Sequence, residues 1–366
     1  MPFLTRLRHA PPRYWLVLVV VLFFIGLPTV VPSFQTSEWT QVLIFAIVIM
    51  GLNILVGYSG QISLGHGALM ALGAYTTAIL IHRYHVEYLA TLPIAGLLTG
   101  LVGFLLGIPA LRLSALYLAL ATFALAVVTP SLIKRPAELT GGVQGILIAA
   151  PDPPAFANNA FTTITGGPPM TSDQWLYYVT LVVALLLFWL AWNLLRHRPG
   201  RAMRAIRDRE VAAAASGINV AGYKTLAFGI SAFYAGIAGG LYGLTIGFVS
   251  PDTFPLALSF QLLVGTVIGG LASIAGPMVG GIFTFWLPIV SSQFVSSQPW
   301  IPAQVAAAFH KAGPAVTYGA LLILIMIYAP NGIVGLVNTG YARLRRRLRG
   351  AGDRENGQMP SDPQTV

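Results

Sequence analysis

The chain has 366 residues, of which 56% are hydrophobic and only 9% are charged, and its mean hydropathy is +0.75. Because charged residues make up about a quarter of an ordinary soluble domain, this composition excludes a soluble protein and predicts an all-α polytopic membrane protein with about ten transmembrane helices of about 20 residues each. The absence of cysteine excludes disulfides, cysteine-ligated zinc and thiol catalysis, and the net charge of +10, placed beside the apolar runs, argues against a nucleic-acid partner.

Most of the positive charge lies in three zones. Sixteen of the 21 lysines and arginines occur before the first apolar run, in or just after residues 196–219, and after the last run. Positive residues near span ends mark the cytoplasmic side. We therefore expect residues 1–13, the loop 196–224 and a disordered basic tail, 337–366, in the cytoplasm. Residues 14–336 would form the membrane domain, with a periplasmic loop at 134–174.

In chain order, the apolar runs predict spans at 14–31, 39–56, 68–81, 88–107, 114–133, 175–195, 226–248, 256–268, 278–292 and 315–328. The first run resembles a signal peptide in position. It contains Pro28 and lacks a small-x-small cleavage site, so we interpret it as a retained span.

A glycine-rich break follows the second span. Residues 57–67 read GYSGQISLGHG, with polar side chains between the glycines. Unwound backbone at membrane depth is tolerated only where it is buried in protein or lines a cavity, so the break is either an ordinary cytoplasmic turn or a discontinuous helix beside a pathway. In the second case the candidate pathway residues here are Asn53, Gly60, Gln61, Ser63 and His66.

Two further glycine-rich segments lie later in the chain. TGGVQGI, residues 140–146, opens the outward segment and adds the candidates Thr140, Gly141, Gly142 and Gln144. GGLASIAGP, residues 269–277, resembles the first break in composition. Gly/Pro-interrupted segments in both halves of a transporter point to a substrate path at their interface.

The central stretch, RHRPGRAMRAIRDREVAAAASGIN at 196–219, holds six arginines in its first fourteen residues. Its pattern predicts one amphipathic helix of about 16 residues, hence about 24 Å long, starting at Pro199 and stopping at Ser216 and Gly217. Such a rigid cytoplasmic rod is either an anchor on anionic lipid or a docking site for a partner. Asp208 and Glu210 among the arginines, and the small face of Ala212–Ala215, favour docking.

Chemistry that would power transport is missing from the sequence. None of the lysines follows a glycine-rich phosphate loop, so the chain has no Walker site. No Asp or Glu falls inside a predicted span, which argues against an ion-coupled secondary transporter, although that class remains the alternative. His82 and His85 suit a polar turn better than a metal site. We predict no catalytic residue, no metal site and no cofactor bound by this chain.

Several ordered blocks carry a family resemblance. They are GLNILVGYSGQISLGHGALMALGAY (51–75), LYLALATFA (116–124), TGGVQGI, RPGRAMRAIRDREVAAAASGINV, GGLASIAGP and PNGIVGL (330–336), and together they resemble the LivM-type permease of branched-chain amino-acid ABC importers. The resemblance implies an importer permease fold with discontinuous helices and a cytoplasmic coupling helix, in the bacterial inner membrane. It also implies a LivH-type second permease, two cytoplasmic ATPases that use ATP and Mg, and a periplasmic binding protein as partners.

The central stretch is similar to the EAA loop of ABC permeases, although its glycine falls one residue later than in the usual motif. The residues expected to couple this chain to an ATPase are Arg201, Arg204, Arg207, Asp208, Glu210, Ala212, Ala213 and Gly217. Relatives of this family import urea, short amides or other amino acids, so the substrate stays open.

Overall fold

The computed structural model describes residues 12–111, 115–166 and 168–296, together with short helical pieces between residues 319 and 339. Residues 1–11, most of the predicted tenth span and most of the basic tail lie outside the described residues. The larger helices are α2 (Pro12–Val30), α3 (Ser33–Asn53), α4 (His66–Tyr84), α5 (Tyr88–Ala110), α6 (Ala115–Lys134), α9 (Ser172–Arg196), α12 (Val220–Ile246), α13 (Leu256–Gly269) and α14 (Gly276–Ser296).

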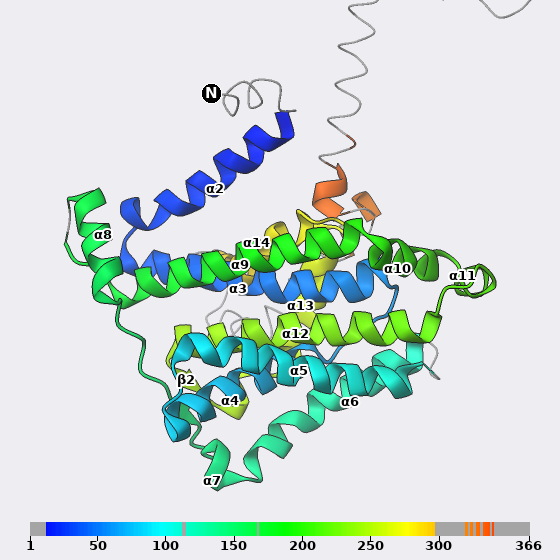
Figure 1. The fold of residues 1–366 in the computed structure, drawn as a ribbon. Coiled ribbons are helices and arrows are strands. Elements are labelled where there is room, and N and C mark those ends of the chain that lie inside the picture. Colours follow the sequence, from blue (N-terminus) through cyan, green and yellow to red (C-terminus); the bar gives the residue numbers. More distant parts are fainter. Residues whose placement is uncertain are drawn as a thin grey trace, which may run out of the picture.

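Smaller elements connect them. They are the π-helical turn η1 (Ile54–Tyr58), α7 (Ala137–Thr140), β1 (Ile146–Leu147), α8 (Ala155–Thr165), α10 (Arg198–Asp208), α11 (Glu210–Ala215), β2 (Phe248–Val249) and the 3-10 turn η2 (Pro251–Thr253). The long helices lie side by side, with α10 and α11 at one end of the bundle and α8 and β2 at the other (Figure 1).

Six helical segments in the described part are long and apolar enough to cross a membrane. They match the predicted second, fourth, fifth, sixth, seventh and eighth spans, which confirms the polytopic helical fold. Helices α2, α4 and α14 coincide with the predicted first, third and ninth spans. The total of about ten spans stays a prediction.

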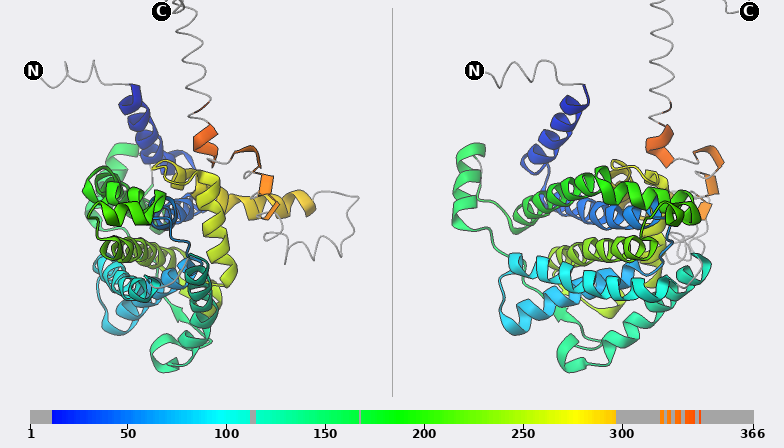
Figure 2. Two further views of the ribbon diagram at one scale, coloured as in Figure 1. Left: turned by 90° about the vertical axis from the view of Figure 1, so that its right-hand side faces the viewer. Right: turned by 45° about the vertical axis from the view of Figure 1, so that its right-hand side comes forward.

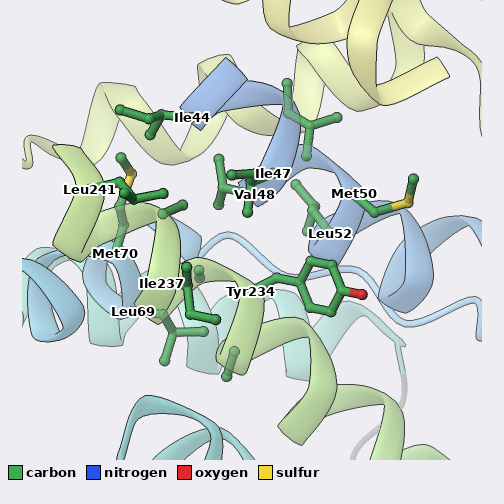
Figure 3. Close-up of a cluster of buried hydrophobic side chains, with 14 of the residues drawn as sticks. Ile44, Ile47, Val48, Met50, Leu52, Leu69, Met70, Tyr234, Ile237 and Leu241 are labelled. Carbon is green, nitrogen blue, oxygen red and sulfur yellow. The ribbon is translucent and has the colours of Figure 1, made fainter. Parts of the chain in front are cut away.

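The core of the bundle is built by α3, α4 and α12. Ile47 and Met50 of α3, Met70 of α4 and Leu241 of α12 are fully buried and pack in one cluster (Figure 3). Tyr234 of α12 lies in the same cluster and donates a hydrogen bond of 2.7 Å from its hydroxyl to the carbonyl of Leu187 on α9. Helix α3 is thereby enclosed from Val42 onward, which fits the uninterrupted apolar sequence of residues 42–52.

Helix α12 approaches its neighbours closely through glycine. A Cβ on Gly73 of α4 would collide with the backbone of Gly236, and one on Gly239 would collide with the Met70 carbonyl. Small residues at such crossings allow helix backbones to touch in a membrane, where the hydrophobic effect does not drive association. Glycine is therefore required for close packing at these two crossings of α4 and α12.

The segment between α6 and α9 pairs with the connection between α12 and α13. Strand β1 pairs antiparallel with β2, with Ile146 opposite Val249 and Leu147 opposite Phe248.

Helices α5, α6 and α9 expose large apolar side chains, among them Leu101, Leu120 and Leu186. Helix α14 packs against α3 and α13, and its later part extends from the body of the bundle (Figure 2).

Candidate functional site

The first predicted break is an unwound segment, residues 59–65, between α3 and α4. It begins after a π-helical turn, in which the Ser59 amide donates to the Ile54 carbonyl at 3.2 Å. π-Turns inside helices are rare and occur frequently at functional sites. Gly60 has a φ of 74°, in the left-handed region. The break is therefore confirmed, and it ends earlier than predicted because His66 and Gly67 already belong to α4.

A single buried amide joins the two glycine-rich breaks. Nδ2 of Asn53 donates to the carbonyl of Ser273 at 2.7 Å, and the Ala272 amide donates to Oδ1 of Asn53 at 2.9 Å. A Cβ on Gly57 would lie 2.5 Å from the Ala272 nitrogen. The second break, residues 270–275 between α13 and α14, thus lies against the first.

The other polar side chains of the first break are buried and bonded within the chain. Nε2 of Gln61 donates to Oγ of Ser59 at 2.7 Å and to the Lys224 carbonyl at 3.1 Å. The ring of His66 is hydrogen-bonded through Nδ1 to Ser63 Oγ at 3.1 Å and through Nε2 to Ser231 Oγ at 2.6 Å. In this conformation these side chains hold the shape of the break.

The exposed residues of the break are different ones. Gly60 is exposed and Ile62 is 41% exposed, whereas Gln61 and Ser63 between and beside them are buried. A molecule that reaches the break in this conformation would meet Gly60 and Ile62 first. Ile62 was not among the residues predicted from sequence, because a lone isoleucine in a membrane protein carries no polar signal.

Three hydroxyl groups on distant helices complete the frame around the break. Ser231 of α12 bonds His66, Thr122 Oγ1 of α6 accepts from the Leu64 amide at 2.9 Å, and Ser259 Oγ of α13 accepts from the Gly67 amide at 2.9 Å. Sequence reasoning missed them. The available signal was that each is an isolated hydroxyl residue in an apolar helix, a position that often bridges helices.

The second group of predicted pathway residues lies elsewhere. Thr140 donates from Oγ1 to the carbonyls of Ile133 and Pro136, at 2.7 and 3.0 Å, and Gly141 and Gly142 have φ values of 70° and 57°. Gln144 is exposed. These residues follow the end of α6 at Lys134, about 18 Å along that helix from Thr122 at 1.5 Å per residue. The structure does not bring the two groups into one site.

The central arginine stretch forms two helices, so the prediction of one rigid helix is wrong. Helix α10 begins at Arg198 with proline in its first turn, and α11 ends before Ser216 and Gly217, which confirms the predicted ends. Arg209 between them is extended, with φ −155° and ψ 102°. In a continuous helix Glu210 would share the buried face of Met203 and Ile206. The interruption frees its carboxylate to pair with Lys224.

The two short helices have a buried and an exposed side. Ala202, Met203 and Ile206 of α10 and Ala213 of α11 are buried against the bundle. The other residues predicted to couple to a partner are exposed, and they are Arg201, Arg204, Arg207, Asp208, Glu210, Ala212 and Gly217. Val211 adds an apolar side chain that is 84% exposed. Ala213 therefore anchors α11 to the bundle in this conformation.

Two polar contacts tie these helices to the bundle. Nη1 of Arg207 donates to the Gly57 carbonyl at 2.6 Å. Nζ of Lys224, at the start of α12, is 2.6 Å from Oε2 of Glu210.

Arg196, at the end of α9, lies over the ring of Trp192 at 5.8 Å. Within the described part of the chain, no group of three or more His, Asp or Glu side chains could hold a metal ion.

Comparison with known proteins adds independent findings. A family model described as "Branched-chain amino acid transport system / permease component" matches residues 37–329. The high-affinity branched-chain amino acid transport system permease protein LivM of Escherichia coli (strain K12) is 34% identical over 335 residues, which cover 88% of this chain and 75% of that protein. LivM of Salmonella typhimurium is 32% identical, covering 87% and 74%.

A second subunit type is similar over a comparable length. The permease protein LivH of Escherichia coli (strain K12) is 25% identical over 313 residues, which cover 80% of this chain and 91% of that protein. No solved structure matches the chain.

Proposed function

The chain belongs to the family of branched-chain amino acid transport permease components, and we propose that it forms half of the translocation pathway of an importer that is driven by ATP hydrolysis in separate subunits. Its substrate would be a branched-chain amino acid or a related small polar solute. The chain contributes the membrane path and a site where the energy-supplying subunit docks.

The observation that carries this proposal is the exposed side of α10 and α11. These helices lie together at one end of the membrane bundle (Figure 1) and present Arg201, Arg204, Asp208, Val211 and Ala212 to a partner. An exposed valine beside alanines, bordered by arginines and an aspartate, suits a groove that has an apolar floor and charged edges. Cytoplasmic ATPase subunits would bind here. These subunits, and not this chain, would bind ATP and Mg.

The side of the membrane follows from charge. Six arginines of residues 196–209 lie at the α10 end of the bundle. Positive charge beside span ends favours the cytoplasm, so this end faces the cytoplasm of a bacterial cell and the β1–β2 end faces the periplasm. Both termini would be cytoplasmic. A periplasmic binding protein would deliver solute to the outer end, where the segment 134–174 lies.

A second permease of the LivH type would complete the pathway. Relatives named LivM and LivH both match this chain over most of its length, so the pair would consist of two similar folds related by an approximate two-fold axis. The exposed apolar faces of α5, α6 and α9 would be divided between that partner and membrane lipid.

The path itself would run beside the paired breaks. An amino-acid zwitterion needs partners for its carboxylate and its ammonium, and unwound carbonyls, helix ends and neutral polar groups provide them. Gly60 and Ile62 are exposed in the present conformation, whereas Asn53, Gln61, Ser63 and His66 would become accessible only when the two breaks separate. Alternation between closed and separated breaks is the movement that ATP would drive.

The test is uptake by the reconstituted complex. The chain is placed in proteoliposomes with its second permease and ATPases, and uptake of labelled leucine is measured with the binding protein present, with and without ATP. We expect uptake only with ATP and with intact ATPases. Robust uptake by the permease alone under a proton or sodium gradient would support an ion-coupled carrier instead.

A further inference from the structure

Two polar connections run from the arginine helices to the same short segment, residues 57–61: one ends on the Gly57 carbonyl, and the other reaches the Gln61 side chain through Lys224. We infer that Arg207 and the ion pair Glu210–Lys224 are positioning residues that transmit movement of α10 and α11 to the first break. This inference rests on the proposed function. It separates Arg207 and Glu210 from the neighbouring residues of the stretch that face a partner.

The first connection holds the end of α3. The amides of Ser59, Gly60 and Gln61 donate to the carbonyls of Ile54, Val56 and Leu55, so the helix end leaves the Gly57 carbonyl for another donor. Nη1 of Arg207 occupies it at 2.6 Å. A guanidinium at a helix C-terminus is favoured by the helix dipole, and a charge-assisted hydrogen bond is stronger than a neutral one.

The guanidinium is held in that position from both sides. Its Nε and Nη2 donate to Oδ1 of Asp208 at 3.2 and 3.1 Å. The stem of Arg207 packs against Gly60, where a Cβ would lie 3.0 Å from Cγ of the arginine. The guanidinium of Arg207 thus donates from one nitrogen to the first break and from two nitrogens to Asp208 at the end of α10.

The second connection reaches the break through α12. Nζ of Lys224 and Oε2 of Glu210 are 2.6 Å apart, and the lysine side chain is only 17% exposed. The backbone carbonyl of the same lysine accepts from Gln61 Nε2, which also donates to Ser59. A shift of α11 that moves Lys224 therefore changes the position of an acceptor on which the fold of the break depends.

Movement of the first break would also move the segments bonded to its two ends. The side chain of Asn53, one residue before the π-turn, is hydrogen-bonded to the backbone of the second break. At the other end of the first break, His66 is hydrogen-bonded to Ser231 of α12. The two connections also attach on either side of the extended Arg209, Arg207 on α10 and Glu210 on α11. Each short helix thus has its own connection to the first break, and movement of either helix would displace the break.

The experiment reverses the ion pair in the reconstituted complex. Glu210→Lys and Lys224→Glu are made singly and together, and ATPase copurification, ATP hydrolysis and leucine uptake per ATP are measured. We expect each single variant to lower uptake per ATP about tenfold, the factor that corresponds to 1.4 kcal/mol, with the ATPase still bound, and the double variant to restore the ratio. Neutral Glu210→Gln, which keeps the side-chain length, tests the same step if the reversals fold poorly.

The matched control is the ion pair at the opposite end of the bundle. Lys134 Nζ and Asp252 Oδ1 are 3.4 Å apart and both side chains are exposed. Lys134→Glu and Asp252→Lys, made singly like the test variants, are each expected to leave uptake per ATP unchanged, because an exposed pair contributes little. An equal loss in this control would overturn the inference, since the effect would then not belong to the path through Gln61.

Arg207 is tested by graded substitution. Arg207→Leu removes the bond to the Gly57 carbonyl and is expected to reduce uptake per ATP, whereas Arg207→Lys keeps a charged donor and is expected to recover most of it. Loss of ATPase binding in Arg207→Leu or Glu210→Lys, without recovery in the double reversal, would show that these residues touch the ATPase directly and would overturn the inference. A wild-type complex without ATP-dependent uptake would instead reject the proposed function on which it rests.

Discussion

Asn53 shows how much one side chain can determine in a membrane bundle. Its amide both donates and accepts, so it satisfies a carbonyl and an N–H of the second break at the same time. A buried backbone group without a partner is costly in a membrane protein because no water replaces it. The asparagine therefore allows two unwound segments to lie against each other.

Replacing Asn53 with leucine should destabilise the protein clearly. Asn53→Leu keeps a similar volume but leaves the part-buried Ala272 N–H and Ser273 carbonyl without this partner, at no more than about 1–3 kcal/mol for each group. Thermal unfolding of the purified protein in detergent measures the effect. Gln144→Leu, at an exposed position, is the control and should unfold at the wild-type temperature. Equal unfolding temperatures for the two variants would refute the role assigned to Asn53.

Gly60 combines a backbone requirement with a close contact. Its φ of 74° disfavours any side chain, and a Cβ would press on Arg207. Gly166, at the end of α8, has a φ of 63° with open space around it. Gly60→Ala should therefore lose more stability than Gly166→Ala, which bears only the backbone strain of about 1–2 kcal/mol. Thermal unfolding of both variants checks this, and an equal loss would show that the contact is unimportant.

Elements that depend on local pattern could be predicted from the sequence, and those that depend on distant pairing could not. The apolar runs and the glycine clusters located both breaks and the first nine helices of the predicted series, because local composition favours helix in the runs and unwinding at the glycines. Glu210, just after the interruption at Arg209, pairs with Lys224 on another helix, and the first break is framed by Thr122, Ser231 and Ser259. No periodicity within one segment encodes a partner on another helix.

Helix α11 is too short to be stable alone, and its apolar exposed side is therefore informative. Only Ala213 of its residues is buried, while Val211 is 84% exposed. Val211→Asp should weaken copurification of the ATPase strongly, because a carboxylate would enter the proposed apolar groove. The matched control is Val143→Asp at the outer end, where valine is 70% exposed. An ATPase that stays fully bound to Val211→Asp would remove α11 from the docking surface.

At the scale of the whole molecule, the two ends of the bundle differ in chemistry. One end has the arginine helices, and the other has β1, β2 and α8 (Figure 1). The exposed residues of β1, β2 and α8 are apolar or neutral polar. The two breaks lie against each other, and the first is connected to the arginine end through Arg207 and Lys224. Energy delivered at one end would therefore reach the path through contacts inside this chain, while solute would arrive from the opposite side.

This arrangement requires one orientation in the membrane, which the sequence makes simple to test. Because the chain contains no cysteine, Ser216→Cys after α11 and Ala160→Cys on α8 each create a single labelling site, and both positions are exposed. A membrane-impermeant maleimide applied to intact spheroplasts should label Ala160→Cys and leave Ser216→Cys unmodified until the membrane is opened. Labelling of Ser216→Cys in intact cells would place the arginine helices outside, where no cytoplasmic ATPase can reach them, and the proposed route of energy through Arg207 would then be impossible.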